Sequence, residues 1–137
     1  MSTSSTPIAA SLSVALGGGV GALARYHLGR AMTVWLGAPA MGVFPWATLA
    51  VNTIGSLMMG LLAGWLVRSG GENVDQWRLL LGVGLLGGFT TFSAFSLELA
   101  TLIQRGQLGI AGIYIMLSIG LGITGFIFGI TMTRLFS

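Results

Sequence analysis

The chain of 137 residues contains no cysteine, no lysine and a single histidine, His27. The lack of cysteine excludes disulfides, thiolate metal sites and cysteine nucleophiles. One histidine without a second histidine or a close pair of acids argues against a classical zinc or di-iron site. The six basic residues are all arginines and are scattered singly, so no basic cluster exists that could follow a nucleic acid backbone.

Charge of either sign is scarce. Only 7% of the residues are charged and 54% are hydrophobic, whereas an ordinary soluble domain has about 25% charged residues. The mean hydropathy is +0.92. We therefore predict an all-α integral membrane protein with one domain, residues 1–137. The first residues, MSTSSTPIAASLSV, lack the lysine or arginine of an export signal, so we interpret them as a polar tail leading into a retained helix.

Four segments are long and apolar enough to span a bilayer, which takes about 20 residues. They cover residues 7–26, 45–67, 79–104 and 107–134. Between the first two, AMTVWLGAPAMGVF is apolar but interrupted by glycine and proline, so we expect an interfacial loop with Trp35 at headgroup level. Every span also carries two glycines four residues apart, which predicts close helix packing; the pairs are Gly17/Gly21, Gly60/Gly64, Gly84/Gly88 and Gly125/Gly129.

The arginines divide equally between the two sides of the membrane. Four spans place Arg68, Arg78 and Arg134 on one side, and the other three arginines, Arg25, Arg30 and Arg105, on the opposite side. This balance removes the positive-inside bias, so the chain can insert in both orientations and pair as an antiparallel homodimer. The alternative is that another cue selects one orientation. Because four helices leave little room for a pore, a transport path forms more easily between subunits.

Polar residues lie inside the spans at helical spacing. Thr48, Asn52 and Ser56 are four residues apart and share one helix face, and Tyr114 and Ser118 repeat this spacing in the last span. One interpretation is interhelical hydrogen bonding, which such residues often provide in membranes. The other is a row of donors that faces a permeating anion.

The third span contains the unusual stretch GGFTTFSAFSLE, residues 87–98. Glycines and adjacent threonines weaken a helix, which predicts a break near Gly87–Thr90. Carbonyls freed at membrane depth must be buried in protein or turned toward an ion or cavity; a simple kink is the alternative. Phe92 and Phe95 lie three residues apart. Their rings can simply pack, or their positive edges can attract an anion.

Three blocks of the sequence resemble the Fluc family of small fluoride channels, also called CrcB proteins. They are GGGVGALARY, ATLAVNTIGS and GGFTTFSAFSLE, on three different spans, and the four-span plan covers essentially the whole chain. The resemblance implies a multi-pass protein of the inner (plasma) membrane. It also implies an antiparallel dual-topology homodimer whose two pores export fluoride passively, with no catalysis.

The resemblance also implies site residues. The expected anion pathway comprises Thr48, Asn52, Phe92, Ser93, Phe95, Tyr114 and Ser118. Arg25 and Glu98 are expected at a vestibule or as helix-end anchors. A structural Na⁺ at the dimer interface is expected on the backbone carbonyls of Gly87 and Thr90. The sequence departs from the family pattern at Ala94 and Gly122, where a hydroxyl is frequent.

Two other functions fit four spans. Small proton-coupled multidrug exporters are also dual-topology dimers, but an intramembrane acid is their coupling element. The first span has none, and Glu98, toward the end of the third span, is the single candidate. A non-transporting scaffold subunit would explain the many glycines but not the clustering of Asn, Thr, Ser and Phe.

Overall fold

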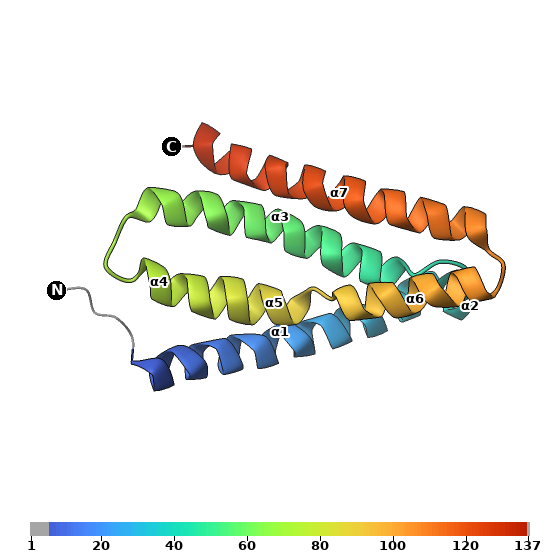
Figure 1. Cartoon of the computed structure of the whole chain (residues 1–137), viewed down its shortest axis with the longest axis horizontal. Helices are drawn as coiled ribbons and strands as arrows, with labels where there is room; N and C mark the ends of the chain where they lie inside the picture. Colours follow the sequence, from blue (N-terminus) through green and yellow to red (C-terminus); the bar gives the residue numbers. More distant parts are fainter. Residues whose placement is uncertain (1–5, 137) are drawn as a thin grey trace.

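Four long apolar helices run back and forth along the molecule in the computed structural model, which describes residues 6–136 (Figure 1). Three are continuous, namely α1 (Pro7–Leu36), α3 (Trp46–Ser69) and α7 (Leu108–Leu135). The other span is built from α4 (Val74–Trp77), η1 (Arg78–Leu86), α5 (Gly87–Phe89) and α6 (Phe92–Gln104). The start of α1 and the end of α7 lie at the same end, as four crossings require (Figure 1). The chain is thus an all-α multi-pass membrane protein, as predicted.

The first helix is longer than the sequence indicated. The Thr6 hydroxyl caps its start by accepting the N–H of Ala9 at 3.3 Å. The helix continues past the predicted end at residue 26 to Leu36, and Gly37 ends it with φ +84°. The short helix α2 (Ala38–Val43) follows, so the prediction of a loop here was wrong. Pro39 lies in the first turn of α2, where no intrahelical N–H is needed.

Helices α3 and α7 lie side by side along most of their length (Figure 1). Glycines bring their backbones together, as the small-residue pairs predicted. A Cβ added at Gly60 would fall on the carbonyl oxygen of Phe126, and one at Gly129 on that of Leu57. Side chains at these positions would force the two helices apart.

Helix α1 packs in the same way against the first half of the third span. A Cβ at Gly17 or Gly21 would fall on the carbonyl oxygens of Leu80 and Leu85, respectively. These two carbonyls belong to η1, a π-helix of nine residues. Its wider i→i+5 turns are rare and were not expected from the sequence.

The third span is interrupted about halfway. Helix α5 ends at Phe89, Thr90 and Thr91 have extended backbones, and α6 begins at Phe92. The break was predicted near Gly87–Thr90. It falls on the two threonines, and Gly87 keeps helical dihedral angles, with φ −63° and ψ −37°.

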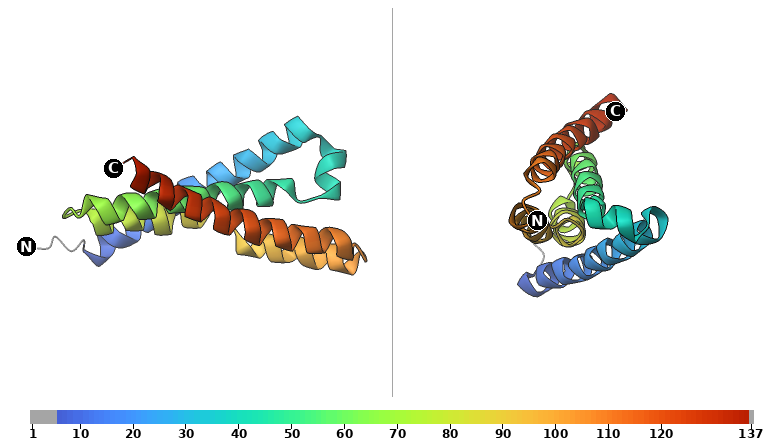
Figure 2. Two further views of the ribbon diagram at one scale, coloured as in Figure 1. Left: turned by 90° about the horizontal axis from the view of Figure 1, so that it is seen from above. Right: turned by 90° about the vertical axis from the view of Figure 1, so that its right-hand side faces the viewer.

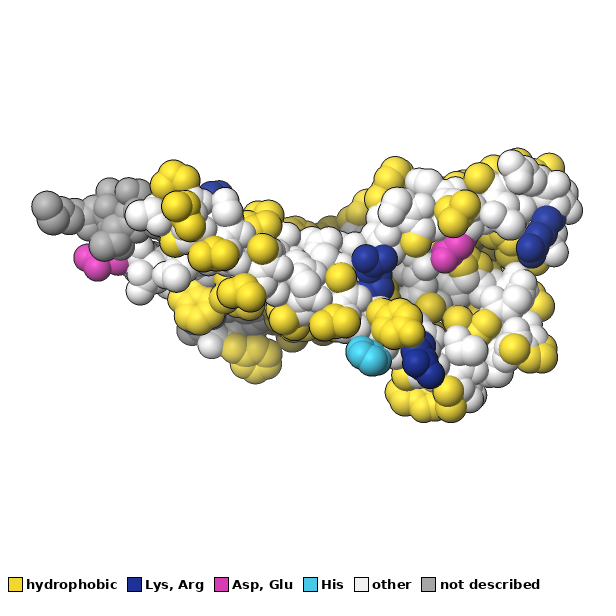
Figure 3. All heavy atoms as spheres, turned by 90° about the horizontal axis from the view of Figure 1, so that it is seen from below, with side chains coloured by type: hydrophobic (Ala, Val, Ile, Leu, Met, Phe, Trp, Pro, Cys, Tyr) yellow, Lys and Arg dark blue, Asp and Glu magenta, His cyan; other side chains and the backbone are white. Residues whose placement is uncertain are grey.

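At one end of the molecule the helices separate. Figure 2 shows the second half of α1 and α2 diverging from α6 and α7. The space-filling view shows a hollow between these two lobes and few charged side chains on a largely apolar face (Figure 3). A cavity of about 350 Å³ lies here between α2, the start of α3 and α6. Its lining includes Phe44, Thr48, Glu98 and Arg105.

We expect Gly21→Ala to lower the thermal stability of the detergent-purified protein, because its methyl group would collide with the Leu85 carbonyl. The matched control is Gly19→Ala, on the same helix, where an added Cβ has nothing within 4 Å. Alanine favours helix by about 1 kcal/mol over glycine, so the control should keep or raise the melting temperature. Equal melting temperatures for both variants would contradict this account of the α1 contact.

Candidate functional site: a capped helix interruption

Asn52 on α3 replaces the backbone hydrogen bonds that Thr91 loses at the interruption. Its side-chain N–H donates to the carbonyl oxygen of Thr91 at 3.0 Å, and its Oδ1 accepts the Thr91 N–H at 2.8 Å. One amide side chain therefore satisfies both polar backbone groups of an extended residue in mid-span. The Thr91 hydroxyl caps α6 by accepting the Ala94 N–H at 3.2 Å, and it also lies 3.2 Å from the Ser93 hydroxyl.

These side-chain caps change what the carbonyls of the interruption can do. In a continuous helix the Thr91 N–H would bind the carbonyl oxygen of Gly87, but here it donates to Asn52. The Ala94 N–H would likewise bind the carbonyl oxygen of Thr90, but it donates to the Thr91 hydroxyl. The carbonyls of Gly87 and Thr90 thus lose their ordinary helical donors.

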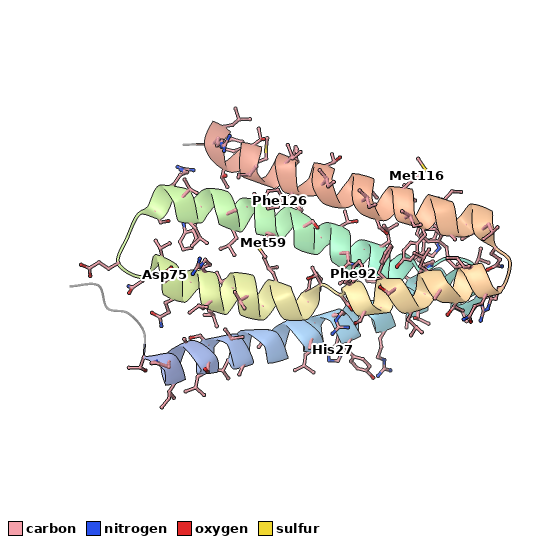
Figure 4. All side chains as sticks on the ribbon, viewed as in Figure 1. His27, Met59, Asp75, Phe92, Met116 and Phe126 are labelled. Carbon is pink, nitrogen blue, oxygen red and sulfur yellow. The ribbon has the colours of Figure 1, made fainter. Side chains whose placement is uncertain are left out.

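Aromatic rings extend from the interruption toward α7. The Phe92 ring centroid lies 5.7 Å from that of Phe95, which lies 5.0 Å from that of Tyr114, both in tilted contact. Phe92 lies beside the interruption (Figure 4) and is 79% exposed in the single chain. Tyr114 is completely buried, and its ring makes a T-shaped contact with that of Phe44. Phe92 and Phe95, three residues apart in the sequence, thus contact each other.

Glu98 on α6 binds two residues on other helices that the sequence analysis did not connect with it. One of its carboxylate oxygens accepts the Thr48 hydroxyl and the other accepts the Tyr114 hydroxyl, each at 2.7 Å. The carboxylate therefore connects α3, α6 and α7, and with Thr48 it helps to line the 350 Å³ cavity. The spacing of Thr48 and Asn52 indicated that Thr48 faces a partner, but no sequence signal identified that partner as Glu98.

Arg25 approaches the interruption from α1. Its Nε donates to the carbonyl oxygen of Gly88 at 3.3 Å. Together with Thr48 and Thr91, Arg25 also lines a cavity of about 100 Å³. A cation therefore lies close to the polar centre of the molecule rather than only at a helix end.

Ser118 is the site residue that gains no partner. Its hydroxyl oxygen on α7 is buried and has no hydrogen bond to any residue that the structure describes. A buried hydroxyl without a partner costs free energy, about 1–3 kcal/mol. Within residues 6–136, no three histidine or acidic side chains gather in a way that could hold a metal ion.

Comparison with known proteins identifies the family. Residues 12–130 match the family model described as "CrcB-like protein, Camphor Resistance (CrcB)". The chain belongs to this family. It is 59% identical to the "Fluoride-specific ion channel FluC" of Erythrobacter litoralis over 131 residues, which is 96% of both chains. The FluC protein of Novosphingobium aromaticivorans is 56% identical over 88% of this chain and 93% of its own, and that of Phenylobacterium zucineum is 47% identical over 90% and 94%. The resemblance of the three sequence blocks to CrcB proteins is confirmed.

We expect Glu98→Gln to destabilise the protein. A glutamine side chain has one acceptor oxygen, so one of the two hydroxyls that now bind the carboxylate loses its acceptor. Hydrogen bonds to a charged group are worth about 1.5–3 kcal/mol, and unfolding in detergent would measure the loss. Glu72→Gln, on an exposed turn, is the control and should leave stability unchanged. Equal stability of both variants would show that Glu98 does not hold the three helices together.

Proposed function

We propose that this protein is a fluoride-specific ion channel that lets fluoride leave the cell passively. The observation that carries the proposal is its 59% identity, over 96% of both chains, to a relative named as such a channel. The geometry agrees with this function, because uncharged donors and ring edges gather at a helix interruption halfway through the membrane. No chemical reaction is required of the site.

The proposed mechanism depends on neutral dipoles. Arg25 attracts the anion to the centre of the molecule. Fluoride then sheds water while Asn52, the hydroxyls of Ser93 and Ser118, and the positive edges of Phe92 and Phe95 replace its hydration shell. Thr48 and Tyr114, held by Glu98, continue this path toward the 350 Å³ cavity. Between Arg25 and Arg105, which lines the 350 Å³ cavity, the groups offered to the anion are uncharged, so it can leave quickly.

We infer that the working unit is an antiparallel homodimer. Phe92 is 79% exposed, and the polar residues around it open onto the side of the molecule rather than into a closed passage. In lipid such a polar opening needs a cover. A second copy in the opposite orientation would supply that cover, and the equal distribution of arginines allows both orientations.

A structural Na⁺ at the centre of this dimer fits the oxygen ligands that the chain offers. Carbonyl oxygens suit hard cations, and broken membrane helices present them to Na⁺. The carbonyls of Gly87 and Thr90 are the two that lose their helical donors to side-chain caps. These carbonyls of each subunit would hold the ion, whose charge would fix the interruption and join the subunits.

Fluoride efflux from liposomes tests the function. We expect the purified, reconstituted wild-type protein to release fluoride electrogenically, as measured with a fluoride electrode, and at the same rate with and without a pH gradient. Transport of drugs driven by that gradient would instead identify a multidrug exporter. Vesicles that release neither would identify a scaffold. Equal release of chloride would contradict the proposed selectivity.

Replacement of the rings tests the pathway. We expect Phe92→Ile and Phe95→Ile to slow fluoride efflux more than about tenfold, which corresponds to about 1.4 kcal/mol of barrier, because an aliphatic side chain has no positive edge. Size-exclusion chromatography should show an unchanged assembly. Phe126→Ile on α7 is a matched control, as Phe126 lines neither of the cavities beside the interruption, and it should conduct normally. Normal efflux in both test variants would remove the rings from the mechanism.

A further inference from the structure

Ser56 lies one helical turn beyond Asn52 on α3 and is not one of the proposed pathway residues. It is half-buried, and it lines a cavity of about 300 Å³ together with Asn52, Thr91 and Phe92. The cavity therefore contains the amide that caps the interruption, the more exposed phenylalanine ring and this hydroxyl. Met59 points from α3 toward α5 at the same place (Figure 4) and gives the cavity an apolar border.

The Ser56 hydroxyl makes no hydrogen bond within the described residues, so it can donate to a ligand in this cavity. Several other serines of the helices donate to the carbonyl four residues earlier, at 2.9–3.0 Å; these are Ser11, Ser69 and Ser96. Ser56 makes no such bond and has no other hydrogen-bond partner in the part of the chain that the structure describes. In the middle of a membrane span, a hydroxyl that does not bond its own helix is costly unless a polar partner reaches it.

Helix α7 carries a row of hydroxyls that stops beside Ser56 of α3. Tyr114 and Ser118 follow each other on α7 at a spacing of four, and the next position of this row is Gly122. A glycine offers no side-chain donor, so the row of hydroxyls on α7 ends there. Across the helix contact, a Cβ added at Gly122 would have its nearest neighbour in the Ser56 hydroxyl oxygen, at 3.6 Å. The hydroxyl of Ser56 thus lies beside position 122, where the row on α7 lacks a hydroxyl.

We propose that Ser56 continues this row and donates a hydrogen bond to fluoride in the cavity beside Asn52. The inference rests on the proposed channel function. The Ser56 O–H offers its proton to the anion, while the small Gly122 leaves room for both. Two helices share one line of hydroxyls: α7 supplies Tyr114, whose proton goes to Glu98, and Ser118, and α3 supplies the next member.

Fluoride efflux from liposomes tests the role of Ser56 once the wild-type protein is shown to conduct. We expect Ser56→Ala to slow efflux about tenfold, the effect of losing one hydrogen bond of about 1.4 kcal/mol in the barrier. Ser11→Ala removes a hydroxyl that bonds its own helix on α1 and should conduct as the wild type does. Should Ser56→Ala fail to fold, Ser56→Cys keeps the shape with a weaker donor, and it should also be slow.

A rescue distinguishes a donor from a packing residue. The double variant Ser56→Ala/Gly122→Ser returns a hydroxyl to the same space from α7 and should recover efflux to within about threefold of the wild type. Ser56→Ala/Gly122→Ala adds the Cβ without the hydroxyl and should stay slow. Wild-type efflux in Ser56→Ala and Ser56→Cys, or no difference between the two double variants, would overturn the role of Ser56 alone. A wild-type protein that releases no fluoride would overturn the channel function, and the role of Ser56 with it.

Discussion

Within a bilayer no water is present to satisfy a backbone N–H or C=O, so every such group needs a partner within the protein. The interruption at Thr90 and Thr91 breaks this rule locally, and Asn52 repairs it with two hydrogen bonds to one residue. The chain can therefore place non-helical backbone halfway through the membrane. Without this repair, the N–H and C=O of Thr91 would lie unpaired in mid-span.

The charged groups near the centre are also engaged by neighbours. Arg25 donates to a carbonyl of α5, and both oxygens of Glu98 accept hydroxyl protons. Neither group stands as a bare charge in the open cavity that contains Asn52 and Phe92. On the proposed pathway, the field that an anion would meet there comes from amide, hydroxyl and ring dipoles. Such dipoles bind an anion more weakly than an ammonium group would, which suits rapid conduction.

Composition and spacing were sufficient to predict four spans and the weak point in the third, since each depends on residues close together in the sequence. The extension of α1 was missed because Gly37 and Pro39 look like loop residues, although one ends a helix and the other begins the next. The partners of Glu98 lie 50 and 16 residues away on other helices. The π-helical turns of η1 lie against α1, which is also distant in the sequence. Neither the partners of Glu98 nor the π-helical turns can be predicted from residues close together in the sequence.

The glycine contacts between helices fix the positions of the hydrogen-bond donors that these helices carry. A small anion loses its water only where replacement donors are already in position, because donors that must first move add their reorganisation to the barrier. Gly17 and Gly21 fix α1 against η1, which sets where Arg25 meets α5, while Gly60 and Gly129 fix α3 against α7. The second contact sets the distance between the donors of α3 and those of α7. Backbones in direct contact cannot close further, so the width between these donors is set by main chain rather than by flexible side chains. A site of fixed width can reject a larger halide that a yielding site would accommodate.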